Sequence, residues 1–504
     1  MKKLITLLTL VLIFTLSVSA NNSGSFNLDV KEFILENGMK VLVLERHASP
    51  TVAVSITFRV GSTNEHLGTT GISHYVEHMM SKGTKIIGTK NYQKEKILIA
   101  EMEEIKNELV SLKKERSSQP KDQATKEDHD ISNLNKRLSV LKKEVKNYRI
   151  TGEITMIYNR FGARGLNATT SNERTWYHCE LPSNKLELWA WLESDRISNP
   201  IWRDFEEEKL VILEERRWRN ESNTVGTLRE NFVALCYQAH PLRRPVIGWR
   251  SDIESITKKQ LDKYYRQYYG PNNAIAVIVG DVETEYVMEL MRKYFEPIPA
   301  SKNHVPEITT IEPKQLGERR TEIELDAQPV LRIGYHTTKI GTKDDYTLDI
   351  VSEILSGGRT SRLYKKLVLE KELCTQIHAY NNAGKFPGLF GFYAMPKHPH
   401  TSKEVEEAIY QELELLKTEE VSDKEITNAK KRINAGFVMG LNSNAGLARM
   451  LGHYEVIASW KYVLNVNTER NKTNKEDIKE IIKKYFHKNN RVVASIISKK
   501  KEKE

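Results

Sequence analysis

Residues 71–80 (Gly-Ile-Ser-His-Tyr-Val-Glu-His-Met-Met) constrain the fold most, because polar residues recur there inside an apolar run. His74 and His78 are four residues apart, and residues at that spacing share one face of a helix. Two neutral imidazoles on one face can bind a small cation such as zinc. Glu77 lies at the edge of this face, where a carboxylate reaches a water at the metal without being a ligand. The stretch therefore predicts a buried metal-binding helix. A helix that carries these residues by chance is the alternative, and the metal site needs a third ligand from elsewhere.

The length and composition favour a soluble protein with more than one domain. At 504 residues the chain exceeds one ordinary core, and 39% hydrophobic with 29% charged residues is typical of globular proteins. The basic residues behind the net charge of +10 are scattered among acidic ones, which argues against a nucleic-acid groove. Cys179, Cys236 and Cys374 lie far apart and form no Cys-x-x-Cys pair. Any metal would therefore be held by nitrogen and oxygen.

The N-terminus has the pattern of an export signal. A basic start and an apolar run at residues 4–18 are followed by Ser19, Ala20 and polar sequence. We therefore expect residues 1–20 to be a signal peptide and the mature protein to be periplasmic or secreted. A retained anchor is the alternative, but the apolar run is short for a membrane span, and no later segment is long enough to cross a bilayer.

Strand and helix patterns alternate along the rest of the chain, and the series occurs twice. The first series has a strand-turn-strand pattern at 33–44 with its turn at 36–38, and strand patterns at 52–60, 166–171, 175–182 and 274–281. Its helix patterns lie at 186–195, 204–219 and 286–294. The second series has strand patterns at 329–335 and 491–497, and helix patterns at 345–355, 361–373, 403–418 and 424–441. Two series of similar size predict a duplicated α+β fold. We expect a catalytic domain at 21–296, a linker at 297–314 and a second, metal-free domain at 315–504.

Residues 90–150 interrupt the first series with a different pattern. Apolar residues spaced by three and four occur on both sides of a breaker stretch at 117–122. This pattern predicts two helices folded into an antiparallel, coiled-coil-like hairpin with its apolar seam inward. An arm for partner contact and an inert insertion both remain open.

The helix predicted at 204–219 could supply the third ligand. Glu208 and Glu215 are seven residues apart, which is two turns along one face. Such a helix can aim a carboxylate at a cation while its apolar stripe stays buried. A solvated acidic run is the alternative.

Together these features resemble the pitrilysin/insulinase family of zinc peptidases over nearly all of the mature sequence. His-x-x-Glu-His is the inverted zincin motif. The family pairs it with a downstream Glu-x-x-x-Val-x-x-Glu helix, matched here by residues 208–215 with Ile212 at the valine position. Further matches lie at residues 166–169, 240–248, 278–281 and 357–364.

The resemblance implies a ligand set and a mechanism. His74, His78 and Glu215 would hold one zinc ion per chain. Glu77 would be the general base for a water at the metal, and Glu208 a second catalytic carboxylate that supports the site. The implied activity is that of a zinc metalloendopeptidase.

The resemblance also implies a substrate geometry. An extended peptide would add to the strand at Asn167 and Ala168 and be held mainly by backbone hydrogen bonds. The two domains would form a clamshell, which favours short or unfolded peptides over folded proteins.

Two departures from the family pattern stand out. His78 and Glu215 are 137 residues apart, which exceeds the family spacing by about the length of the hairpin at 90–150. Active single-chain relatives also carry an Arg and a Tyr in the second half that bind the substrate carbonyl region, and Val368 and Thr375 occupy those positions here. We therefore expect a heterodimer with a metal-free sister subunit, with a homodimer as the alternative.

Three other functions compete with peptide hydrolysis. The chain could be a structural subunit that has lost catalysis, a peptide-binding subunit without turnover, or a metal-storage protein. The first conflicts with the presence of all three ligands and the base. Metal storage is the least favoured, because a single buried ligand set has little capacity.

Overall fold

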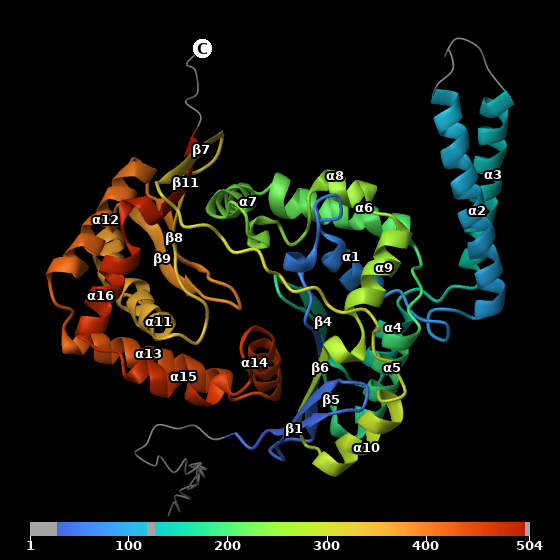
Figure 1. Cartoon of the computed structure of the whole chain (residues 1–504), viewed down its shortest axis with the longest axis horizontal. Helices are drawn as coiled ribbons and strands as arrows, with labels where there is room; N and C mark the ends of the chain where they lie inside the picture. The colour runs from blue at the N-terminus through green and yellow to red at the C-terminus, as the bar shows by residue number, and fades with distance from the viewer. Residues whose placement is uncertain (1–27, 118–125, 499–504) are drawn as a thin grey trace, which may run out of the picture.

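The computed structural model describes residues 28–117 and 126–498, arranged around two β-sheets (Figure 1). The predicted signal peptide at residues 1–20 lies outside the described residues. Within the described part of the chain, no helix combines the length and apolar character needed to cross a bilayer.

The first sheet has six strands in the order β1-β2-β6-β3-β5-β4. These strands are β1 (Lys31–Ile34), β2 (Lys40–Glu45), β3 (Thr51–Phe58), β4 (Arg164–Thr170), β5 (Thr175–Pro182) and β6 (Ala274–Gly280). Every residue of β6 is buried, as expected for an apolar strand inside a sheet. It runs parallel to β2 and antiparallel to β3, and β4 forms one edge.

The second sheet has five strands in the order β7-β11-β8-β10-β9. They are β7 (Arg319–Leu325), β8 (Val330–His336), β9 (Cys374–Asn382), β10 (Leu389–Pro396) and β11 (Arg491–Ser498). Apart from β1, this order repeats that of the first sheet, including one parallel pair, here β7 with β11. The predicted duplicated α+β fold is therefore confirmed.

Helices cover both sheets. In the first half they are α1 (Ile72–Met79), α4 (Glu153–Arg160), α5 (Leu186–Ser198), α6 (Phe205–Arg216), α7 (Thr224–Cys236), α8 (Arg250–Ser255), α9 (Lys258–Tyr268) and α10 (Thr284–Tyr294). In the second half they are α11 (Lys343–Ser356), α12 (Ser402–Thr418), α13 (Asp423–Gly440), α14 (Asn444–Ile457), α15 (Tyr462–Asn471) and α16 (Lys475–Tyr485). Two predicted helices differ in form. The one at 204–219 continues as a π-helical turn after Arg216, and most of the one at 361–373 is a π-helix at Tyr364–Glu370.

Each half contributes one helix to the sheet of the other half. Leu447 and Leu451 of α14 pack with Val277 of the first sheet, and Figure 1 shows α14 beside that sheet. Phe232 of α7 packs with Val492 of the second sheet. These exchanged helices bury apolar surface between the two halves and so hold them together.

The insertion forms a helical hairpin, α2 (Tyr92–Ser117) and α3 (Lys126–Lys146), that projects from the body (Figure 1). Its seam contains Met102, Ile105, Leu109, Leu141 and Val145, apolar residues at the predicted spacing of three and four. Residues 118–122 of the predicted breaker stretch lie outside the described residues. At the base of α2, buried Glu95 accepts hydrogen bonds of 2.7 and 2.9 Å from Arg203, which fixes the hairpin to the first half.

Candidate metal centre

The start of α1 is fixed by a glycine and a buried acid. Gly71 has φ of 89°, and a Cβ there would lie 2.5 Å from the carbonyl oxygen of Ile247. Glu65 accepts hydrogen bonds from the backbone N–H groups of Gly71 (2.8 Å) and Ser73 (2.9 Å), which have no partner within the helix. Burial raises the pKa of Glu65 to about 7 despite these bonds. The backbone in front of His74 is therefore held on both sides.

The structure brings His74, His78 and Glu215 together. Nε2 of His78 lies 3.3 Å from Oε2 of Glu215, and Nε2 of His74 lies 3.8 Å from the same oxygen. One donor atom from each of the three residues falls within 4.8 Å of the other two. The α1 helix supplies both imidazoles, and α6, which packs against α1, supplies the carboxylate.

This donor set fits zinc. Bonds of about 2.0–2.1 Å in a tetrahedral site separate ligand atoms by roughly 3.4 Å, close to the two distances seen here. The other ring nitrogen of His78, Nδ1, lies 2.8 Å from Oε1 of Glu208, which also pairs with Lys82. A carboxylate on that nitrogen fixes the ring orientation and leaves Nε2 directed at the cluster, as is usual for metal-binding histidines.

The electrostatics of the cluster favour a positive charge. Burial lowers the pKa of His78, but hydrogen bonds to Glu208 and Glu215 outweigh it and raise the value to about 9. Burial, and then the charge of His78, lowers the pKa of His74 to about 4. One imidazole therefore holds a proton between two carboxylates, and a metal cation satisfies the same charge balance.

Glu77 lies beside the cluster and is not one of its three members. Its Oε2 accepts a 2.6 Å hydrogen bond from Oγ1 of Thr170 on β4. Burial raises the pKa of Glu77, although this hydrogen bond works in the opposite direction. A half-buried carboxylate with a raised pKa and a fixed orientation suits a group that accepts and returns a proton.

Asn167 and Ala168 lie on β4, the edge strand of the first sheet. Asn167 pairs with His178 and Ala168 with Tyr177 of β5, and α1 packs beside β4. The side chain of Asn167 accepts a 2.9 Å hydrogen bond from the N–H of Ala168. The edge strand predicted to bind substrate is therefore a neighbour of the histidine helix.

Four neighbours of the cluster were not predicted. Thr170 orients Glu77, Lys82 pairs with Glu208, and Glu65 holds the start of α1. Arg219 places Nη1 3.0 Å from Oε1 of Glu215, four residues away on the same helical stretch. Only Arg219 had a sequence signal, because a Glu followed four residues later by an Arg is a common helical ion pair.

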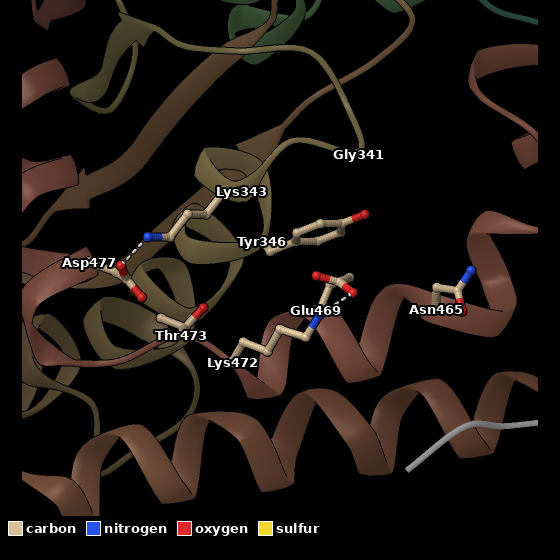
Figure 2. Close-up of a pocket in the computed structure, with 8 residues that line it drawn as sticks. All are labelled: Gly341, Lys343, Tyr346, Asn465, Glu469, Lys472, Thr473 and Asp477. Carbon is tan, nitrogen blue, oxygen red and sulfur yellow. Dashed lines mark hydrogen bonds and ion pairs between the residues drawn. The ribbon is translucent and has the colours of Figure 1, made fainter. Parts of the chain in front are cut away.

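Other polar groups lie apart from this cluster. The second half contains a cavity of about 500 Å³. Its charged side chains are paired with each other, Lys343 with Asp477 at 2.5 Å and Lys472 with Glu469 at 2.6 Å (Figure 2). A second group of acids consists of Glu45, Glu283 and Glu285, all exposed. The three cysteines are free and buried.

Comparison with known proteins supports the same reading of the chain. A sequence model of the insulinase family (peptidase family M16) matches residues 40–109, which include the histidine helix. A second, described as the peptidase M16 inactive domain, matches residues 255–433. The zinc protease PqqE of Helicobacter pylori is 28% identical over 457 residues, covering 89% of this chain and 88% of that protein. The chain is thus similar to the insulinase family, peptidase family M16, in parts of both halves.

Solved structures of other proteases share the fold. A crystal structure of a protease from Helicobacter pylori has a TM-score of 0.78 at 24% identity and covers 94% of this chain and all (100%) of that one. The periplasmic protease PqqL from Escherichia coli has a TM-score of 0.68 at 16% identity, covering 94% of this chain and 48% of that one. The match of the inactive-domain model to much of the second half agrees with the absence of a His-x-x-Glu-His motif there.

Proposed function

We propose that this chain is a zinc-dependent endopeptidase whose metal is held by His74, His78 and Glu215. The observation that carries the proposal is the meeting of one donor atom from each within 4.8 Å, although Glu215 lies 137 residues beyond His78. Zinc in this position would supply Lewis-acid polarisation of a peptide carbonyl. In this proposal residues 21–296 form the catalytic domain, 297–314 the linker and 315–504 a metal-free domain.

Glu77 is the proposed general base. Its carboxylate takes a proton from the attacking water and gives it to the leaving amine nitrogen. Thr170 holds one oxygen, Oε2, at 2.6 Å, which leaves the other oxygen, Oε1, for this proton transfer. Glu208 acts through His78, whose ring it orients, so it is a positioning residue in this scheme.

An extended peptide is the proposed substrate. It would add to the outer edge of β4 beside Asn167 and Ala168, where backbone hydrogen bonds supply affinity and leave side-chain tolerance broad. A chain that has to lie as one more strand of the sheet must be extended, so short or unfolded peptides fit and folded proteins do not.

A metal-free sister subunit is the proposed partner, and export is the proposed route. Val368 packs against the core of the second half, and the hydroxyl of Thr375 lies 3.4 Å from the carbonyl oxygen of Met395. Neither side chain offers the donors that a substrate carbonyl needs, so a second chain has to supply them. Export follows from the signal-like residues 1–20. Faster cleavage when a related metal-free protein is added supports the partner, and full activity of the chain alone contradicts it.

An inert or peptide-binding subunit is the second candidate, favoured by the inactive-domain match at residues 255–433. Glu77→Gln distinguishes the two, with Glu214→Gln as a control because Glu214 is exposed and pairs with Arg217. A peptidase loses about 10²–10⁴-fold in cleavage rate with Glu77→Gln and keeps its zinc. Equal cleavage by both variants, or no cleavage by the parent chain with its partner present, would support the second candidate.

A further inference from the structure

The face of β5 that looks toward the second half carries polar side chains. Trp176 and His178 pair with Thr57 and Ser55 of β3, so all four lie on one face of the sheet. The rings of Trp176 and His178 stack, with their centroids 3.7 Å apart. The α14 helix covers this face at Gly452, where a Cβ would lie 3.1 Å from Oγ1 of Thr57. The polar face of β5 therefore borders the junction between the halves.

Two arginines lie close enough at this junction for their charges to interact. Arg174 precedes β5, and its guanidinium lies 5.3 Å from the centre of the Trp176 ring. Arg449 lies on α14, and its charge acts on Arg174. Among the described residues neither guanidinium forms an ion pair. The nearest acid in sequence, Glu173, accepts a hydrogen bond from the backbone N–H of Lys385, and its charge acts on Arg174 without forming an ion pair. Like charges at a partly buried site are unfavourable unless an anion joins them.

The same place has buried polar atoms without partners. Nη1 of Arg174, Nε1 of Trp176 and Nδ1 of His453 are buried and form no hydrogen bond. Groups of this kind are uncommon in folded proteins and call for an explanation. Burial, and then the two arginines, lowers the pKa of both His178 and His453 to about 4, so both rings are neutral at pH 7 and each can still donate one hydrogen bond. The site is rich in unpaired donors, and among the described residues no carboxylate forms an ion pair with either guanidinium.

Strand β4 connects this site to the proposed substrate. Asn167 and Thr169 pair with His178 and Trp176, so their side chains lie on the same face. A peptide that adds to the outer edge of β4 would place every second side chain on this face as well. Neighbouring strands are about 4.8 Å apart, so an acidic side chain and an arginine can together span the distance from that peptide to β5.

We propose that Arg174 and Arg449, with Trp176, His178 and His453 around them, bind a carboxylate of the peptide substrate. The proposal rests on the peptidase function and adds a preference for acidic peptides. The carboxylate comes from an Asp or Glu side chain or from the peptide C-terminus, since both present the same two oxygens to a guanidinium.

Peptide binding tests this site without requiring turnover. The full chain with Glu77→Gln keeps peptides intact, and fluorescence anisotropy at 0.15 M salt measures their Kd. Labelled peptides of alternating Val and Glu are compared with Val and Gln peptides, each with a C-terminal acid or amide. We expect about tenfold tighter binding of a peptide that carries the recognised carboxylate. A difference between Glu and Gln peptides identifies side chains as its source, and a difference between acid and amide identifies the C-terminus.

Arg449→Gln is the decisive variant, because Arg449 is exposed on α14 and its loss leaves the core intact. It should reduce the tenfold preference to less than about twofold. Lys403→Gln removes the same charge from an exposed position on α12 and should keep the preference. Equal Kd values for all four peptides, absence of binding, or an unchanged preference in Arg449→Gln would overturn the proposal. A parent chain that prefers acidic peptides but cleaves none would contradict the peptidase function and leave the carboxylate site standing.

Discussion

The two halves share a sheet order but differ in how they balance the charges around one helix. In the first half α1 connects β3 to the rest of the sheet, and its histidines meet carboxylates from α6. In the second half α11 follows β8, the matching strand, and carries Asp345 and Asp349. A guanidinium is already present there, because Nε of Arg470 lies 2.7 Å from Oδ2 of Asp349.

This difference indicates which half is suited to bind a cation. In the second half Asp345 and Asp349 are joined by the amide of Asn381, at 2.8 and 2.9 Å, and Arg470 supplies the positive charge. In the first half the carboxylates meet imidazoles, which can release a proton and accept a metal. One fold therefore supports an internally compensated charge cluster in one half and a candidate metal centre in the other.

Arg470→Gln breaks the compensated half and should have the largest effect on stability. It leaves two carboxylates together in a mostly buried place, so we expect the free energy of unfolding to fall by about 3 kcal/mol. Chemical denaturation measures this change. Lys424→Gln, at an exposed position on α13, should change it by less than about 0.5 kcal/mol. Zinc content should stay the same in both variants, and loss of zinc from Arg470→Gln would show that the halves are not independent in this respect.

A pH series sharpens the comparison through Asp345. Burial, and then the charge of Asp349, raises the pKa of Asp345 from 3.8 to about 6. A raised pKa means that the folded state binds the proton more tightly. This contribution to stability is therefore complete below about pH 3.8 and is lost as the pH rises through about 6. Asp345→Asn removes it, so relative to the parent the variant should gain on the order of 2 kcal/mol between pH 4 and pH 7. Parallel pH profiles of the two proteins would refute this assignment.

Glu208→Gln tests the carboxylate that orients His78 in the first half. Its expected change in zinc affinity is the smallest of the three effects. Replacing the carboxylate weakens its hydrogen bond to Nδ1 of His78, so zinc affinity should fall about tenfold. Competition with a chelator of known affinity measures this. Glu207→Gln is the matched control, because Glu207 points to Lys142 on the hairpin and stays exposed. Equal zinc affinity in the two variants would contradict the orienting role of Glu208.

Much of this architecture could be predicted from local sequence. The spacing of His74 and His78 and the alternation in β3 and β5 are properties of short segments, and the hairpin seam follows from its apolar period. The choice of Glu208 and Glu215 over their neighbours Glu207 and Glu214 depended on the family resemblance. Both pairs are glutamates seven residues apart, so the local sequence does not distinguish them. The structure separates them, since Glu214 is exposed and pairs with Arg217.

Some of the elements that were missed depend on distant contacts. Strand β9 contains polar residues such as Gln376 and His378, and its pattern is clear only beside β10. Helix α14 begins with small residues and packs on the sheet of the other half, which no local pattern indicates. Thr170 meets Glu77 across 93 residues that include the whole hairpin, so their hydrogen bond had no sequence signal.

The most direct test of the account is the zinc content of the purified chain and of Glu215→Gln, measured by mass spectrometry after dialysis against metal-free buffer. Glu214→Gln serves as the control, because it changes the adjacent exposed carboxylate and leaves the cluster intact. The account predicts about one zinc per chain in the parent and in Glu214→Gln, and a loss of most of it in Glu215→Gln. Full zinc retention by Glu215→Gln, or a parent chain that binds none, would contradict it.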